Sequence, residues 1–447
     1  MSEHQFYDSL VEFAAQNPLR LHMPGHKGKT LPMEEWNALA SLDFTELPPT
    51  GDLYGSDDWL EEAQRLWAWD WSFDAAFFST GGSTQGIFTL FGLFVKPGDT
   101  IICDRVSHKS IHHAMALYDV NPVWLHRDWD EGCALTGPVR PEQVEALLNE
   151  HPEATCVLLT TPTYYGVLTH LEPIARLCHD RGVKLLVDGA HGGHLPLVLD
   201  GEDNCPLGYN PFACADGVTI STHKTLPAPG QTAVVFANGV RLAELKRAGA
   251  LTGSSSPSYP MMAALDKLRV WMWENKGSYR KCAAICGDLR RSYPSLPHPA
   301  LDPCRLVLQV EDGYDLAVKL EEMGIYVEMA DKYHIVAILT GLDDEKDVLR
   351  LKRALNLFGL KGIKAFVPTL EAPPIPQRSC SIRQARFGDY DRTPMSRSEG
   401  KVCAETVAPY PPGVPVVTMG EELDEKTLAY LRKLCYDDAS VVLTIAQ

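Results

Sequence analysis

The stretch Ser221-Thr-His-Lys-Thr225 places a lysine directly after a segment with the pattern of a buried strand. Farther upstream, the apolar run Val183-Lys-Leu-Leu-Val187 ends on a carboxylate, Asp188. Open α/β sheets bind their ligands at the carboxyl ends of the strands. The two segments therefore predict that Lys224 and Asp188 lie at one edge of a sheet, where an amine and a carboxylate can act on the same ligand.

Alternating strands and helices surround these two segments. Two further apolar runs, Asp99–Cys103 and Cys156–Thr160, each lead into a polar loop. Helical patterns over Pro141–Asn149 and Leu171–Arg181 separate the strands. Such βα repeats are typical of parallel sheets. We therefore predict an α/β fold with a mainly parallel, doubly wound sheet.

The remaining chain predicts an arm and a second, smaller domain. Residues 1–60 hold one short helix followed by a stretch punctuated by proline and glycine, which predicts an irregular N-terminal arm. We assign residues 61–291 to the large domain, and residues 292–447, where short strands alternate with amphipathic helices, to a small C-terminal α+β domain. Residues 371–420 are polar and proline-rich, and their last part, Ala408-Pro-Tyr-Pro-Pro-Gly-Val-Pro415, predicts a polyproline-like loop.

The amino-acid composition argues against some classes of binding partner and indicates a cellular compartment. The 447 residues carry a formal net charge of −17, from 41 basic and 58 acidic residues. This balance argues against nucleic acid or an anionic membrane surface as a partner. The 12 cysteines are scattered without a CxxC pair, and the N-terminus has no basic and apolar leader segment. We therefore predict a soluble cytoplasmic protein with reduced thiols.

A turn of small residues, Ser79-Thr-Gly-Gly-Ser-Thr84, joins an apolar strand to a helix with an apolar stripe. The free N–H groups at the start of a helix, next to Gly82 and the hydroxyls of Ser83 and Thr84, can bind a phosphate dianion. The alternative is an ordinary Ser/Thr cap after a glycine turn. The turn has no Walker lysine and no G-x-G-x-x-G pattern, so it does not indicate a nucleotide fold.

Four separate strand ends thus carry groups that suit one cofactor. They supply the small-residue turn, the imidazole of His108, the carboxylate of Asp188, and Lys224 with a hydroxyl and an imidazole beside it. Pyridoxal 5′-phosphate (PLP) needs an amine for its aldehyde and an anion for its pyridinium nitrogen. Each residue alone also fits a plain role as a solvated lysine, a helix cap or a loop histidine. Together they predict a PLP site.

Histidine pairs offer a competing interpretation as metal ligands. His108 and His112 are one helical turn apart with His113 adjacent, and His191 and His194 are close in the chain. The His-x-x-x-His spacing lacks the glutamate of the metalloprotease motif, and no third ligand is evident. We therefore predict no metal site.

The chain resembles the Orn/Lys/Arg decarboxylases, the basic amino acid decarboxylases of PLP fold type I. Seven motifs carry this resemblance, and their order along nearly the whole chain is more specific than any one of them. The motifs are Met23-Pro-Gly-His-Lys-Gly28, Gly81-Gly-Ser-Thr84, Ser107-His-Lys-Ser110, Asp188-Gly-Ala-His191, Ser221-Thr-His-Lys-Thr225, Ser256-Pro-Ser-Tyr259 and Ala408-Pro-Tyr-Pro-Pro-Gly413.

The resemblance implies a role for each residue of the PLP site. Lys224 would form the covalent link to the cofactor, and Asp188 would pair with the ring nitrogen. His108 would stack on one face of the ring and Ala190 would lie on the other, while His191 would lie near the reacting substrate. The phosphate would be held by Gly82, Ser83, Thr84, Ser221 and His223, and by Ser255 from the second subunit of a homodimer or higher homo-oligomer with composite sites.

The activity implied is decarboxylation of arginine, lysine or ornithine to the amine and carbon dioxide, as in polyamine metabolism. The cationic end of such a substrate needs an anion, for which Glu405, Asp52 and Asp57 are candidates, although each also fits a solvated loop carboxylate. Two alternatives remain open: another PLP reaction at Cα, such as transamination or aldol cleavage, and a catalytically silent homologue.

The chain also departs from the family pattern. After the lysine motif it has Ala228-Pro-Gly-Gln231 where the family has Ala-Leu-Thr-Gln, a serine at Ser255 replaces a threonine, and Met419 replaces a proline. In length it resembles the short members, which have no receiver-like N-terminal wing. These departures leave the cofactor chemistry intact and the choice of substrate open.

Overall fold

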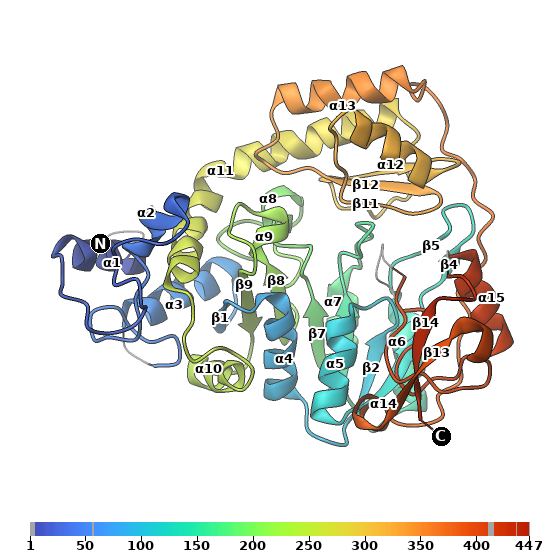
Figure 1. Ribbon diagram of the computed structural model, residues 1–447, viewed down its shortest axis with the longest axis horizontal. Helices are drawn as coiled ribbons and strands as arrows, with labels where there is room; N and C mark the ends of the chain where they lie inside the picture. The colour runs from blue at the N-terminus through green and yellow to red at the C-terminus, as the bar shows by residue number, and fades with distance from the viewer. Residues whose placement is uncertain (1–4, 56–57, 410–414, 435, 447) are drawn as a thin grey trace. The chain divides into compact units, whose positions relative to one another are not determined.

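Figure 1 shows the computed structural model of the protein, which describes residues 5–55, 58–409, 415–434 and 436–446. The chain forms two compact units, and each takes residues from two separate stretches: 1–94 with 186–280, and 95–185 with 281–447. The chain crosses between the units at the end of helix α4 (Gly82–Phe94), within strand β7 (Lys184–Asp188) and within helix α11 (Tyr259–Ser292). The domain boundaries predicted near residues 60 and 291 stay a prediction.

In the first unit, four strands lie in the order β1-β9-β8-β7. Besides β7 and α11, the described elements of this unit are α1 (Gln5–Ala15), η1 (Glu34–Trp36), α2 (Asn37–Ala40), α3 (Trp59–Trp71), β1 (Ala75–Ser79), α4 (Gly82–Phe94), α8 (Leu195–Val198), β8 (Gly217–Ser221), α9 (Thr222–Thr225), β9 (Ala233–Ala237) and α10 (Leu242–Ala250).

Helices cover these strands. Every residue of β1, β8 and β9 is buried, as expected for apolar strands enclosed on both faces. Helix α4 packs on β8 and β9, and α3 and α10 pack on β1. Among the core aromatics, Trp71 stacks on Phe236 with ring centroids 4.8 Å apart, and the Trp67 indole N–H donates to the carbonyl of Leu265 at 3.0 Å.

The direction of β9 is the main feature of this sheet that the sequence does not predict. Strands β7 and β8 are parallel, whereas β9 runs antiparallel to both β1 and β8. Only residues 222–232 connect β8 to β9. A parallel pair needs a crossover of about a dozen or more residues, usually with a full helix, so this short connection favours the antiparallel arrangement.

The second unit holds strands in the order β6-β2-β3, a three-stranded sheet in the order β10-β12-β11, and two pairs, β4-β5 and β13-β14. Its described elements are β2 (Thr100–Asp104), α5 (Lys109–Tyr118), β3 (Asn121–Leu125), β4 (Trp129–Asp130), β5 (Leu135–Thr136), α6 (Pro141–Glu150), β6 (Ala154–Thr160), α7 (Leu171–Asp180), β10 (Arg305–Gln309), α12 (Gly313–Glu322), β11 (Met329–Ala330), β12 (His334–Ile338), α13 (Glu345–Leu357), α14 (Ile382–Phe387), β13 (Tyr390–Pro394), η2 (Met395–Arg397), α15 (Glu425–Lys433) and β14 (Val441–Ile445).

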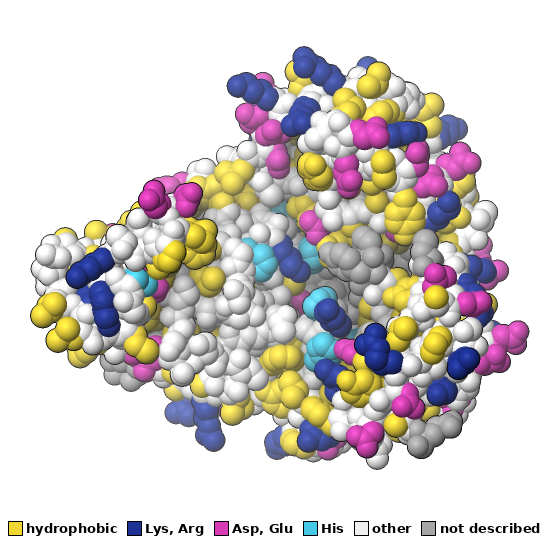
Figure 2. Space-filling model, in the orientation of Figure 1, with side chains coloured by type: hydrophobic (Ala, Val, Ile, Leu, Met, Phe, Trp, Pro, Cys, Tyr) yellow, Lys and Arg dark blue, Asp and Glu magenta, His cyan; other side chains and the backbone are white. Residues whose placement is uncertain are grey.

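The strand β2 is parallel to both β3 and β6. A buried ion pair joins the ends of β2 and β3, where Arg127 Nε donates to both carboxylate oxygens of Asp104 at 3.1 Å. Neither side chain is exposed to solvent. Elsewhere in this unit, acidic and basic side chains are interspersed over α12 and α13 (Figure 2), and the pairs include Lys319 with Asp315 at 2.6 Å. These helices therefore have a charged outer face.

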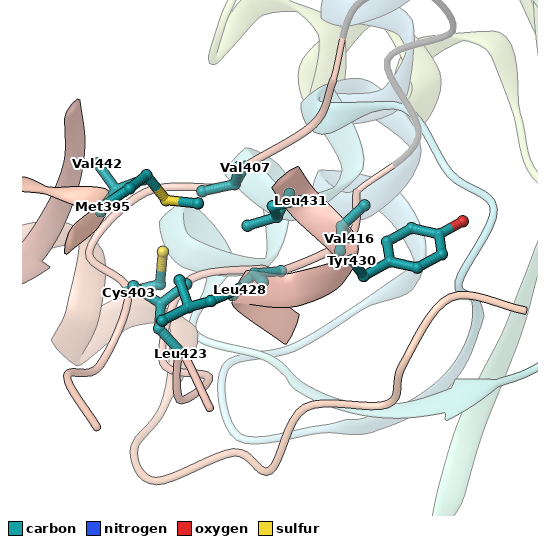
Figure 3. Close-up of a cluster of buried hydrophobic side chains, with 10 residues drawn as sticks. Met395, Cys403, Val407, Val416, Leu423, Leu428, Tyr430, Leu431 and Val442 are labelled. Carbon is teal, nitrogen blue, oxygen red and sulfur yellow. The ribbon is translucent and has the colours of Figure 1, made fainter. Parts of the chain in front are cut away.

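Residues 371–420, which are polar and proline-rich in sequence, contain α14, β13 and η2. Strand β13 pairs antiparallel with β14, near the C-terminus. The adjoining apolar cluster includes Met395, Cys403, Leu428 and Leu431, and Tyr430 lies at its edge with its hydroxyl directed away from the other side chains (Figure 3). Residues 410–414 of the predicted polyproline-like segment lie outside the described residues.

A helix long and apolar enough to span a bilayer is not found among the residues that the structure describes.

Candidate active site

Lys224 lies on the short helix α9, directly after the buried strand β8. Its side chain is half-buried, and its Nζ lies 3.2 Å from Nε2 of His191. His191 itself is buried and follows β7 by three residues. The amine and the imidazole are therefore close enough to exchange a proton.

Asp188 is the last residue of β7 and pairs in register with Thr219 of the parallel strand β8. Its side chain is buried, and one carboxylate oxygen accepts a hydrogen bond from the backbone N–H of Ala190 at 3.2 Å. The loop after β7 is tied to β8, because Gly189 N–H donates to Thr219 O at 2.9 Å and Ser221 N–H donates to Ala190 O at 3.3 Å. The structure thus brings the lysine and the carboxylate to the same strand edge.

The small-residue turn joins this group at the start of α4. The helix begins at Gly82, whose φ of +70° is a left-handed conformation that favours glycine. The Ser221 hydroxyl donates to Ser83 Oγ at 2.9 Å, which links the turn to the end of β8. Thr84 is exposed. The N-terminus of α4 and two hydroxyls therefore converge beside the lysine strand.

His223 is oriented by its backbone surroundings. Its Nδ1 donates to the carbonyl of Thr232 at 2.8 Å, and the hydroxyl of Thr222 donates to that of Thr232 at 2.7 Å. Because a carbonyl can only accept, the proton on Nδ1 is fixed and Nε2 is the nitrogen left for a ligand.

Ser255 lies in an exposed turn between α10 and α11. The hydroxyl of Tyr54 donates to the carbonyl of Ser254 at 3.1 Å, and Ser256 N–H donates to Ser254 Oγ at 3.1 Å. The turn is thus anchored at Ser254, and the side chain of Ser255 lies on the surface of the described chain.

His108 belongs to the second unit, where it caps the N-terminus of α5. Its Nδ1 accepts from Ser110 N–H at 3.2 Å, and the ring is exposed. The neighbouring His112 is fully buried, and both of its ring nitrogens contact hydroxyls, Nε2 that of Ser107 at 3.0 Å and Nδ1 that of Thr418 at 2.6 Å. Burial, with the positive charge of Arg105 as a second cause, lowers the pKa of His112 well below its ordinary value. His112 is therefore a neutral structural residue, and it does not form a metal pair with His108.

The three carboxylates predicted to bind the substrate cation are in different situations. Glu405 is partly exposed, and its Oε2 lies 4.0 Å from Nη1 of Arg386. Asp52 accepts a hydrogen bond from Tyr54 N–H at 2.9 Å, as in an Asx turn. Asp57 lies outside the described residues. Glu405 therefore already has a cationic neighbour in its own unit, and Asp52 already caps a turn.

A cavity of about 670 Å³ in the second unit is not anticipated by the sequence. Its wall includes Tyr165, Asp331 and His334, which bond to one another: Tyr165 donates its hydroxyl to Asp331, and His334 Nδ1 lies 3.0 Å from Asp331 Oδ1. Burial raises the pKa of Tyr165 well above its ordinary value. Tyr165 lies far along the chain from Asp331 and His334, so no local pattern joins all three. None of the predicted site residues that the structure describes lines the cavity.

Two family models match the chain. Residues 4–291 match the Orn/Lys/Arg decarboxylase major domain, and residues 369–440 match the Orn/Lys/Arg decarboxylase C-terminal domain. Among relatives, an arginine decarboxylase of Halalkalibacterium halodurans is 31% identical, with 96% of this chain and 92% of the relative covered. An arginine decarboxylase of Bacillus anthracis is 29% identical, with 96% and 93% covered.

The likeness extends to solved structures. The lysine decarboxylase of Francisella novicida aligns with a TM-score of 0.83 at 18% identity, covering 99% of this chain and 81% of that chain. A TM-score of this size shows a common fold. The predicted fold class, a mainly parallel α/β sheet of PLP fold type I with a smaller C-terminal domain, is confirmed.

Proposed function

We infer that this chain, which belongs to the Orn/Lys/Arg decarboxylase family, removes the α-carboxylate of a basic L-amino acid as carbon dioxide and releases the corresponding amine, with PLP as cofactor. The observation that carries the inference is the shared strand edge, where Lys224 Nζ lies 3.2 Å from His191 Nε2 and the buried carboxylate of Asp188 ends the next strand. The likeness to arginine decarboxylases over nearly the whole chain supports it.

The residues of the first unit fit PLP. Its phosphate needs hydrogen-bond donors, which the N-terminus of α4 and the linked hydroxyls of Ser83 and Ser221 can supply. Thr84 is a further donor in our assignment, and His223 can donate from Nε2 as the imidazolium, in which both ring nitrogens carry a proton. Gly82 adopts a φ of +70° at the point where the backbone would approach the phosphate, so a side chain there would be strained.

The chemistry divides between the cofactor and the chain. When bound, PLP supplies an electron-accepting ring for the electron pair that departing carbon dioxide leaves on Cα. Lys224 holds the cofactor through its amine, and Asp188 keeps a proton on the ring nitrogen by offering a buried negative charge. After the carboxylate has left, Lys224 Nζ or His191 Nε2 delivers a proton to Cα, which completes the amine product.

The remaining assignments come from the family. We propose that His108 stacks on the ring of the cofactor and that Ala190, buried at the end of β7, borders the other ring face. For the substrate cation, Glu405 and Asp52 remain candidates, each in competition with its present partner. Asp57 keeps its place as a third candidate. The amine product fits polyamine metabolism.

A product screen with L-arginine, L-lysine and L-ornithine tests the proposed function. We expect one of them to yield carbon dioxide and its amine in equal amounts, with PLP required. A keto acid in place of carbon dioxide would identify an aminotransferase, and an aldehyde fragment an aldolase. No turnover of any of the three, in protein that carries PLP, would contradict the proposal.

We further propose that the protein is at least a homodimer, in which the turn Thr252–Ser256 of one subunit completes the site of the other. Support comes from the family assignment of Ser255 and from the exposure of this turn in the described chain. None of the described cysteines is in a disulfide, which fits the reducing cytoplasm that we propose as its location.

Subunit mixing tests the composite site. A Lys224→Ala chain and a chain with Ser254–Ser256 replaced by alanine should each be inactive alone. Mixed under conditions that exchange subunits, they should regain part of the activity, because one site of each hybrid dimer receives an intact lysine and an intact turn. Absence of rescue, with hybrid dimers verified by mass, would mean that each subunit builds its site alone.

A further inference from the structure

Gln85, one turn into α4, organises the small-residue turn from inside the protein. Its side chain is buried, and its Oε1 lies 2.9 Å from both the backbone N of Gly81 and the hydroxyl of Ser79. The Gly81 N–H can only donate, which fixes the orientation of the amide. The Ser79 hydroxyl also reaches the carbonyl of Gly82 at 2.8 Å. Gln85 thus holds Gly81 directly, and it reaches Gly82 only through Ser79, whose single hydroxyl hydrogen is shared between Gln85 Oε1 and the carbonyl of Gly82.

The other end of the same amide contacts the last turn of α10 and the loop that follows it. Gln85 Nε2 donates to the carbonyl of Gly249 at 3.4 Å. Gln85 also forms a hydrogen bond with the hydroxyl of Tyr54. Burial raises the pKa of Tyr54, and the hydrogen bond with Gln85 lowers that pKa in part. A Cβ on Gly253 would lie 2.1 Å from Tyr54 Oη and 2.4 Å from Gln85 Nε2. A side chain does not fit at position 253, so the backbone of Gly253 packs directly against the side-chain amide of Gln85.

We propose that Gln85 is a positioning residue for the phosphate of PLP. It holds the β1–α4 turn in the conformation that presents its N–H groups, and it joins that turn to the one that carries Ser255. The inference rests on the proposed function, because it takes the N-terminus of α4 as the phosphate site. The physical reason is that glycine loses more conformational freedom on ordering than any other residue, so that an unbraced Gly81-Gly82 turn would lose entropy on binding the dianion.

A purely structural role is the competing explanation, and the protein contains a matched example of one. Gln64 on α3 is also fully buried, accepts from the backbone N–H of Phe78 at 3.1 Å, and donates to the carbonyl of Leu60 at 3.2 Å. It makes the same kinds of hydrogen bond as Gln85 but braces the first residues of α3 and the middle of β1. Loss of either glutamine should cost stability, and only loss of Gln85 should affect phosphate binding.

The test compares PLP with pyridoxal, which lacks the phosphate. We expect Gln85→Met, in the full-length protein freed of cofactor, to weaken PLP binding about tenfold, the effect of one or two lost hydrogen bonds. Pyridoxal binding should change less than about twofold, within the scatter of such values. Gln64→Met should lower the melting temperature and leave the ratio of the two affinities as in the wild type.

A second pair of variants approaches the amide from its other side. Gly253→Ala should displace Gln85 and weaken the binding of PLP relative to that of pyridoxal. Gly277→Ala is the control, because a Cβ at that position lies within 4 Å of no other atom, and it should leave both affinities unchanged. Because Gly253 lies in the turn that also carries Ser255, its selective loss supports the inference only together with the same loss at Gln85, and Gln85→Leu takes the place of Gln85→Met if that variant does not fold. Equal weakening of both ligands in Gln85→Met or Gly253→Ala, or the same selective loss in Gln64→Met, would overturn the inference. If the wild type itself binds no PLP, that result contradicts the proposed function rather than the role of Gln85.

Discussion

Replacement of Lys224 by alanine is expected to abolish decarboxylation, with a loss of roughly 10³-fold or more, because in the proposed mechanism Lys224 both anchors the cofactor and donates a proton. The side chain is half-buried at the strand edge next to His191, and no other group described there is a primary amine. The phosphate turn on α4 remains intact in the variant. PLP should therefore still bind, without the visible absorbance band that the lysine-linked cofactor gives.

Two control variants test whether activity needs the amine of Lys224 or only its positive charge, and whether loss of an unrelated lysine also lowers activity. Lys224→Arg keeps the positive charge but cannot form the covalent link at neutral pH, so it should be as inactive as alanine. Lys319→Ala removes an exposed helix lysine paired with Asp315 and should keep full activity. Turnover near the wild-type rate in Lys224→Ala would show that the assignment is wrong.

Asp188→Asn is expected to lower kcat by roughly 10²- to 10³-fold, the range seen when one preorganised electrostatic partner is removed from a buried site. Asparagine has nearly the same shape and can keep the contact with Ala190 N–H, so the fold and PLP binding should persist. What is lost is the negative charge that keeps a proton on the ring nitrogen. Steady-state kinetics and the melting temperature, measured together, distinguish a loss of the catalytic charge from a loss of stability.

Asp266 offers a matched comparison for this substitution. It is a buried carboxylate of the same unit that accepts a hydrogen bond from Tyr7 N–H at 3.0 Å. Asp266→Asn should reduce stability and leave kcat unchanged. Asp188→Asn should lower kcat and leave stability unchanged. A loss of only about twofold in kcat for Asp188→Asn would mean that another group supports the nitrogen.

The sequence predicts best those features that a continuous local pattern encodes. The apolar run before Lys224 and the one before Asp188 are strands β8 and β7, and their parallel pairing brings the two residues to one edge as expected. The family order of the motifs predicts the fold class for the same reason. Five of the motifs lie at the end of a strand or at the start of a helix, where few residue types satisfy the local backbone, whereas Met23–Gly28 lies in a loop between α1 and η1.

Features that depend on distant segments are not predictable in this way. Strand β13 has exposed, polar residues and exists because it pairs with β14, so its own sequence reads as a loop. The neighbour of Glu405, Arg386, comes from α14. Gln85 follows the motif Gly81–Thr84 by one residue and looks like an ordinary helix position, because its partners Tyr54 and Gly249 lie far away in the chain.

The pairing of β1 with β9 has a consequence for how the protein is made. All five residues of β1 are buried in the finished structure, and one of its edges is covered by β9, which is encoded far downstream. At about 5–20 residues per second on the ribosome, the nascent β1 waits on the order of ten seconds for its partner. During that time the segment Ala75–Ser79 is an apolar strand edge open to other chains. Expression yield should therefore depend on chaperones that shield nascent chains.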